Sequence, residues 1–292
     1  MAEHDPTALT IEWTLGLCAS RGSETVDVAA GAREGLLVVS DGPGGHGTGW
    51  LGARLTVRGL LARGSTSAAE ARFVGAADGA PDLARWTGGV ARAADIEYEK
   101  HAADAGDRAA RELASLFADI DRELAGPPKH SPASLLAGCT ATRLDGARVL
   151  GAHVGIGRAL LFRAGADHFE NLVVEHYMHL VGNRTPQFRD IDPAQIPLNI
   201  MVNGLGALAS SGVGIDRFAV ELGAGDLLLL CSRRLDIPDE EAARIARTAL
   251  DDGVPLHELA RAIERRAAMT PSPSDVAFAI ALARPIEAPP SR

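Results

Sequence analysis

The stretch from Leu36 to Gly49 constrains the fold more than any other part of this chain. Four apolar residues, Leu36 to Val39, predict a buried strand that leads to a single carboxylate, Asp41. Glycines crowd the turn that follows, and glycine allows positive φ angles and a close approach of the backbone to an ion. A carboxylate at the end of a strand can also bind a hard cation. The stretch therefore predicts a binding site just before an amphipathic helix that begins near Trp50, the alternative being a glycine-rich loop with an incidental aspartate.

Length and charge limit the kinds of protein this chain can be. With 292 residues, 46% of them hydrophobic, it can bury one large core or two small ones, and we favour one domain. The formal net charge of −9 and the lack of a Lys/Arg run argue against a nucleic-acid partner, which needs clustered positive charge. No apolar stretch reaches membrane-spanning length, so a membrane partner is not expected either.

The cysteines indicate a reducing compartment. Cys18, Cys139 and Cys231 lie far apart in apolar surroundings, which is typical of reduced thiols in a core rather than of disulfides or a metal cluster. The first residues are acidic and polar, where a secretory signal would be basic and then apolar. These features predict a cytoplasmic protein.

The hydrophobic pattern predicts a mixture of strands and helices. Alternating or continuous apolar runs predict strands over residues 9–20, 36–39, 134–142, 147–155, 158–163, 218–222, 226–232 and 273–280. Helical spacing predicts helices over residues 50–63, within 81–125, and over 240–250 and 255–269. The three strands between residues 134 and 163 are expected to form an antiparallel meander. Residues 285–292 are expected to be a disordered tail.

Several of these stretches together resemble one protein family. Asp41-Gly-Pro-Gly-Gly-His46 resembles the Asp-Gly-Met-Gly-Gly-His signature of the metal-dependent protein phosphatases, the PPM or type 2C family. Gly138-Cys-Thr-Ala141, Val154-Gly-Ile-Gly-Arg-Ala159 and Asp226-Leu-Leu-Leu-Leu-Cys-Ser232 resemble three more of its motifs. The resemblance runs from about residue 10 to 284. It implies an α+β fold, a four-layer αββα sandwich of two antiparallel sheets flanked by helices, as a single PPM-type domain over residues 1–292.

The resemblance also implies a site, which this chain keeps only in part. The family uses carboxylates to bind two Mn²⁺ or Mg²⁺ ions, and an arginine to hold the substrate phosphate. Here Asp41 and the Gly42 carbonyl match metal ligands, and Arg21 matches the phosphate-binding arginine. Family acids are replaced at four positions, namely Val26, Ile156, Arg233 and Ser274.

The replacements at Val26, Arg233 and Ser274 remove metal ligands, and the one at Ile156 removes an acceptor for metal-bound water. A valine offers no lone pair, and the guanidinium of Arg233 cannot be deprotonated to coordinate a cation. Three nearby acids, Asp27, Asp236 and Asp275, could act as displaced ligands. Asp27 is expected to face away from the site, because adjacent residues of a strand point to opposite faces.

Three classes of function follow from this partial site. The first is a pseudophosphatase in bacterial-type signalling, with no cofactor, that binds a protein partner, a phosphoprotein or an anionic ligand. Arg21, Arg233 and Arg234 could hold the anion, or Arg233 could instead pair internally with Asp41 or Asp236. The second class is an active Ser/Thr phosphatase that uses Mn²⁺ or Mg²⁺ and displaced acids. The third is an interaction module whose cleft is no longer used.

A zinc site is a further alternative. His176 and His179 have a spacing that could place two imidazoles on one helical face. No third ligand is in register with them, so we expect surface or core histidines instead.

Overall fold

The described part of the chain covers most of the predicted core. A computed structural model describes residues 9–18, 26–33, 35–43, 49–64, 71–75, 108–125, 135–177, 180, 200–207, 214–235, 237–270 and 275–285. The predictions for the tail beyond residue 285, for His179 and for residues 81–107 lie outside these ranges.

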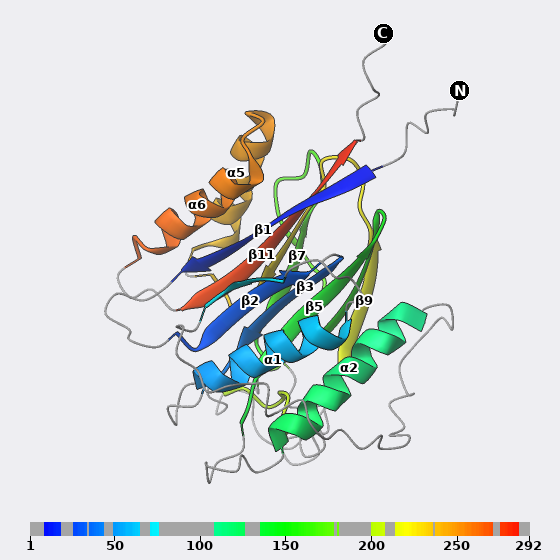
Figure 1. Cartoon of the computed structure of the whole chain (residues 1–292). Coiled ribbons are helices and arrows are strands. Elements are labelled where there is room, and N and C mark those ends of the chain that lie inside the picture. The colour runs from blue at the N-terminus through cyan, green and yellow to red at the C-terminus, as the bar shows by residue number, and fades with distance from the viewer. Residues whose placement is uncertain are drawn as a thin grey trace, which may run out of the picture.

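The described strands form two antiparallel sheets (Figure 1). Sheet A has five strands in the order β1 (Leu9–Cys18), β11 (Val276–Pro285), β10 (Leu227–Cys231), β7 (Arg158–Phe162) and β8 (Glu170–Asn171). Sheet B has six strands in the order β4 (Arg72–Val74), β2 (Val28–Arg33), β3 (Leu36–Asp41), β5 (Gly138–Asp145), β6 (Arg148–Val154) and β9 (Asp216–Glu221).

Helices cover the outer face of each sheet. α1 (Gly49–Gly64) and α2 (Arg108–Ala125) pack on sheet B, whereas α5 (Asp239–Asp251) and α6 (Leu256–Ala267) pack on sheet A. In α6 the buried residues recur at helical spacing and form one apolar stripe, Leu256, Leu259, Ala260, Ile263 and Ala267. A third apolar cluster, which includes Val39, Leu228 and Leu230, fills the space between the sheets. The expected four-layer αββα sandwich is confirmed.

Val154, near the end of the strand predicted over residues 147–155, is buried, but not between the sheets. It belongs to the cluster that β5 and β6 form with α1 and α2 on the outer face of sheet B. Successive residues of a strand point to opposite faces, so Val149 in the same strand packs between the sheets instead.

The predicted meander between residues 134 and 163 is wrong in its last strand. β5 pairs with β6, but β7 pairs with β10 of the other sheet, so the turn at Gly155 carries the chain across the sandwich. Gly155 has a φ of 91°, and a Cβ there would lie 2.5 Å from the Cα of Gly138. A sharp crossing turn that only glycine fits has replaced the hairpin that the spacing suggested.

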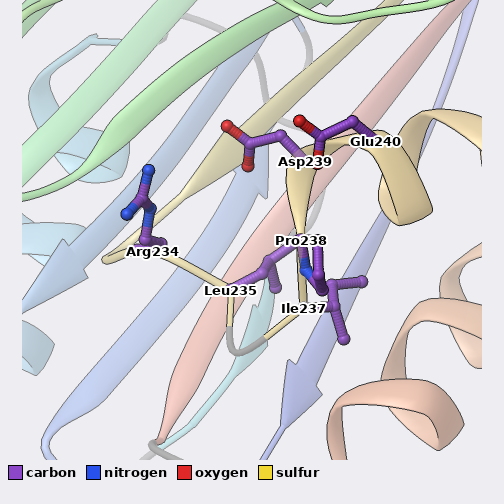
Figure 2. A pocket seen from close by; sticks show the side chains of 6 residues that line it. All are labelled: Arg234, Leu235, Ile237, Pro238, Asp239 and Glu240. Carbon is purple, nitrogen blue, oxygen red and sulfur yellow. The ribbon is translucent and has the colours of Figure 1, made fainter.

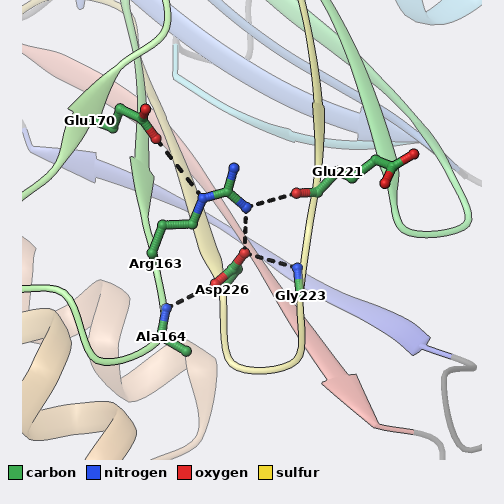
Figure 3. A network of polar contacts seen from close by, with 6 residues as sticks. All are labelled: Arg163, Ala164, Glu170, Glu221, Gly223 and Asp226. Atoms are coloured by element: carbon green, nitrogen blue, oxygen red, sulfur yellow. Dashed lines mark hydrogen bonds and ion pairs between the residues drawn. The ribbon is translucent and has the colours of Figure 1, made fainter.

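The connection from β9 to β10 also crosses between the sheets, and Asp226 holds it (Figure 3). The buried carboxylate of Asp226 accepts hydrogen bonds from the backbone N–H groups of Gly223 and Ala164, each at 2.8 Å. Arg163 donates to the same carboxylate at 2.7 Å and to the carbonyl of Glu221 at 2.7 Å. The aspartate therefore closes the turn between β9 and β10 and ties it to the residues that follow β7.

Candidate functional site

The site predicted at the end of β3 contains an ion pair between Asp41 and Arg233. Asp41 is the last residue of β3 in sheet B, and Arg233 follows β10 in sheet A. Nε of Arg233 donates to Oδ2 of Asp41 at 2.7 Å, and Nη2 donates to Oδ1 at 2.6 Å. The Asp41 side chain is 2% exposed and that of Arg233 27%. The guanidinium therefore binds both carboxylate oxygens of the aspartate that matches a metal ligand.

Gly42, the residue after Asp41, lies tightly against the start of α1. The N–H of Gly42 donates to the Asp27 carbonyl at 2.8 Å. A Cβ on Gly42 would lie 1.8 Å from the Gly49 carbonyl oxygen, so the turn needs glycine at this position. This close approach places the N-terminus of α1 beside Asp27.

Asp27 faces the site, contrary to our expectation. Its carboxylate accepts a hydrogen bond from the N–H of Trp50 in the first turn of α1, and it interacts electrostatically with Arg233 and Asp275. Val26 instead packs against the core between the sheets. Strand alternation does not apply, because β2 begins only at Val28 and Asp27 lies in the turn before it.

A third aspartate completes the acidic side of the site. Asp275 directly precedes β11 and interacts electrostatically with both Asp41 and Arg233. Burial raises the pKa of Asp41 above that of an exposed aspartate, and the negative charges of Asp27 and Asp275 add to this effect while Arg233 opposes it. Burial disfavours the charged form of Arg233, but the Asp41 carboxylate outweighs it and raises the pKa of the guanidinium. Asp41 and Arg233 thus stabilise each other's charged forms.

The remaining predicted residues are spread around this pair. Half-buried Ile156 lies in the crossing turn between β6 and β7, and its backbone N would be 3.4 Å from a Cβ on Gly138, the strand partner of Asp41. Exposed Arg234 lines a surface groove of about 460 Å³ at the start of α5, together with Asp239 and Glu240 (Figure 2). Three predicted residues, Arg21, Ser274 and Asp236, lie outside the described residues.

Tyr177 is a residue of the site that the sequence analysis missed. It is half-buried, and its phenol interacts electrostatically with Asp41, Arg233 and Arg234. Burial raises its pKa, and the negative charge of Glu175 adds to the rise. Nothing in the local sequence marks Tyr177, because a long connection between β8 and β9 brings it to the end of β3.

A second bidentate ion pair was also missed. Arg158, the first residue of β7, is 3% exposed and donates to both carboxylate oxygens of Asp239 at 2.7 and 2.8 Å. Asp239 is the first residue of α5, where its negative charge also interacts favourably with the helix dipole. The turn from β10 to α5 therefore has an Arg–Asp pair at each end, Arg233–Asp41 and Arg158–Asp239. Arg158 lies within the Val154–Ala159 stretch that resembles a family motif, and this position was the sequence signal that could have pointed to the pair.

His176 is a buried structural residue rather than half of a zinc pair. Its Nδ1 accepts hydrogen bonds from the N–H of Gly155 at 3.1 Å and the side-chain amide of Asn203 at 3.0 Å. With Nδ1 used as an acceptor, Nε2 carries the proton and donates to Asp216 at 3.1 Å. No three His, Cys, Asp or Glu side chains in the described ranges are grouped as a metal site.

Comparisons with known proteins agree with the fold. The sequence matches no protein-family model and no curated protein. The structure resembles the S. agalactiae serine/threonine phosphatase with a TM-score of 0.65 and 17% identity, over 94% of this chain and 99% of that one. It resembles serine/threonine phosphatase Stp1 from Staphylococcus aureus with a TM-score of 0.64 and 20% identity, over 99% of this chain and 100% of that one.

A third similar structure contains metal. The catalytic domain of the serine/threonine protein phosphatase PstP, in complex with two manganese ions, has a TM-score of 0.59 and 18% identity, over 94% of this chain and 99% of that one. At these identities the likeness establishes the fold. The chain therefore has the fold of the PPM-type serine/threonine phosphatases that its motifs resemble.

Proposed function

We propose that this chain is a pseudophosphatase, a phosphatase-fold protein that binds a protein partner or an anionic ligand without metal-dependent catalysis. The observation that supports this proposal is the Arg233–Asp41 pair. Asp41 matches a metal ligand of the family, and both of its oxygens are bound by a permanent cation. A phosphoprotein partner in bacterial-type signalling is the ligand class that the fold suggests.

Charge explains why this arrangement does not fit the family's two metal ions. Two divalent ions a few ångströms apart repel each other strongly and need several carboxylates to compensate. Here a guanidinium occupies the space beside Asp41, and it adds a positive charge where the family has a negative one. A metal ion at Asp41 would have to displace Arg233 and then remain beside it. No catalytic step through a metal is therefore proposed.

Phosphatase activity is the second candidate, because Asp27 and Asp275 lie in electrostatic range of Asp41. If Arg233 swung away, three carboxylates would remain at the ends of neighbouring strands. Metal-dependent hydrolysis by these displaced acids would then be possible.

Activity assays separate the two candidates. We expect no hydrolysis of p-nitrophenyl phosphate or of phosphopeptides by the purified protein with Mn²⁺ or Mg²⁺. Metal-dependent turnover that is abolished in Asp41→Asn would refute the pseudophosphatase proposal. Arg233→Asp, which restores a carboxylate, should bind Mn²⁺ more tightly than both the wild type and the matched Arg233→Ala variant in calorimetry.

Anion binding needs a separate test, because Arg233 is already paired. Phosphate, sulfate and a phosphopeptide are titrated into the full chain by calorimetry at two salt concentrations. Saturable, salt-sensitive binding that Arg21→Ala and Arg234→Ala weaken would support an anionic ligand. No binding at millimolar ligand would leave the protein partner as the proposed ligand and rule out the small-anion site.

A further inference from the structure

Among the strands that the structure describes, the long strand β1 forms the outer edge of sheet A and pairs with β11 on one side only (Figure 1). An edge strand presents backbone N–H and C=O groups on its free side and can pair with another chain. β1 is ten residues long and lacks proline, lysine and arginine, the residues that commonly protect an edge. A groove of about 720 Å³ runs beside it and is lined in part by Ile11, Glu12, Trp13 and Thr14.

The hydrogen bonds of neighbouring residues show which backbone groups of β1 face outward. Ala277 and Ala283 of β11 both bond toward β10, so their partners on β1, Leu17 and Ile11, point away from β11. Consistent with this, the N–H of Leu17 donates at 2.9 Å to Glu264 of α6 rather than to β11. Because the direction alternates along a strand, Trp13 and Leu15 also face outward.

This pattern leaves one symmetric segment at the edge. Glu264 already binds the outward N–H of Leu17, so the part of the edge that no other described strand or side chain occupies runs from Ile11 to Leu15, with Trp13 at its centre. In an antiparallel pair of two such segments, Trp13 lies opposite Trp13 of the other copy and Ile11 lies opposite Leu15. The outward backbone groups of these residues are therefore self-complementary about Trp13, which is the requirement of a two-fold interface. Their apolar side chains, which pack against the core between the sheets, would become cross-strand neighbours in the joined sheet.

The one charged residue of β1 supports the same register. Glu12 is paired with Arg284 of its own sheet at 2.6 Å. A two-fold axis at Trp13 places Glu12 opposite Thr14, whereas an axis at Glu12 would oppose two carboxylates, which is unfavourable. An axis at Thr14 would place Leu17 opposite Ile11 of the other copy, and the N–H of Leu17 could not bond to that strand because it already donates to Glu264. Charge and hydrogen bonding thus favour the same axis.

We propose that β1 is a homodimer interface, in which two copies of this chain pair their β1 strands antiparallel about Trp13 and join their five-stranded sheets into one. About six backbone hydrogen bonds would link the copies over residues 11–15. Arg72 lies over the Trp13 ring at 5.3 Å, so the ring is held in place while its backbone stays at the free edge. This proposal does not depend on the site around Asp41.

Sedimentation equilibrium of the full chain from micromolar to near-millimolar concentration tests the dimer. Thr14→Glu places a carboxylate opposite Glu12 of the partner copy and should raise the dimer dissociation constant about fivefold or more, since two symmetric pairs are affected. Thr14→Lys is the matched control and should lower it. A monomer at all concentrations, or the same effect from both variants, would overturn the proposal.

Disulfide trapping tests the position of the axis independently. The native cysteines are buried, so an introduced cysteine at the edge reacts selectively. Trp13→Cys should form a disulfide-linked dimer on mild oxidation, because opposed residues of paired strands lie within disulfide range. Thr10→Cys, which this register places opposite Gly16, should stay monomeric under the same conditions. Efficient cross-linking through Thr10→Cys and none through Trp13→Cys would refute the proposed register.

Discussion

Removing the Arg233 side chain should destabilise the protein through the charge it leaves behind. In Arg233→Ala the Asp41 carboxylate, 2% exposed in the native structure, loses both guanidinium hydrogen bonds. Breaking a buried ion pair costs about 3 to 5 kcal/mol, and we expect about 3 kcal/mol because Arg233 keeps 27% exposure. Asp41→Ala should cost less, about 1 to 2 kcal/mol, since the freed guanidinium can reach water.

The double variant shows whether the effects come from the pair itself. With both side chains removed, no unpaired charge remains, so Arg233→Ala/Asp41→Ala should cost less than the sum of the single variants by about 1 to 3 kcal/mol. Urea unfolding at pH 7, followed by circular dichroism, measures each free energy of unfolding. Arg234→Ala, at the exposed next residue, is the control and should change stability by about 0.5 kcal/mol or less. Additive single effects, within about 0.5 kcal/mol, would refute this account of the pair.

Three further predictions concern the core around the site. Leu228→Ala, at a fully buried position between the sheets, should lower the free energy of unfolding by about 2 to 5 kcal/mol in urea denaturation, and no change would contradict the sheet assignment. Burial and the neighbouring His176 lower the pKa of His153 from 6.5 to about 3, so the stability that the neutral imidazole contributes is fully present above pH 6.5 and is lost as the pH falls toward 3. Between pH 8 and 5 the free energy of unfolding of the wild type should therefore fall by about 2 kcal/mol more than that of His153→Gln. Equal decreases in the two proteins would contradict a buried neutral imidazole. Gly155→Ala should lower the melting temperature because its φ is positive and its Cβ would clash with Gly138, whereas Gly146→Ala, a positive-φ glycine in open space, should have a smaller effect.

Much of the fold was predictable because its elements carry strong local patterns. The buried run of β3, the apolar stripe of α6 and the motif around Asp41 each place an element by composition and spacing alone. Spacing does not say which strands pair. β6 and β7 are separated by a short glycine turn that is compatible with a hairpin, and only the contacts across the sandwich show that β7 belongs to the other sheet.

The candidate site was predictable only in part, for a related reason. The family motif located Asp41 and Arg233, but it said nothing of their hydrogen bonds. Asp27 was misplaced because we extended the alternation of β2 to a residue that precedes the strand. Tyr177 was not found, since it lies in the long connection between β8 and β9 and no sequence motif marks it. Residues at strand ends and in long connections are positioned by tertiary packing, which local sequence does not encode.

The Arg233–Asp41 pair also joins the two sheets at one end of the sandwich, because Asp41 ends a strand of sheet B and Arg233 follows a strand of sheet A. A free metal ion in this place would stabilise the fold to an extent that rises with the logarithm of its concentration relative to its dissociation constant. A guanidinium is carried by the chain itself, so its link to Asp41 needs no ion taken up from solution, and its planar shape matches a carboxylate. In the proposed pseudophosphatase, the arginine that replaces a family acid therefore supplies the connection between the sheets from within the chain. Such a connection favours the proposed binding role, in which a fixed surface is needed, over a reaction that requires an exchangeable cation.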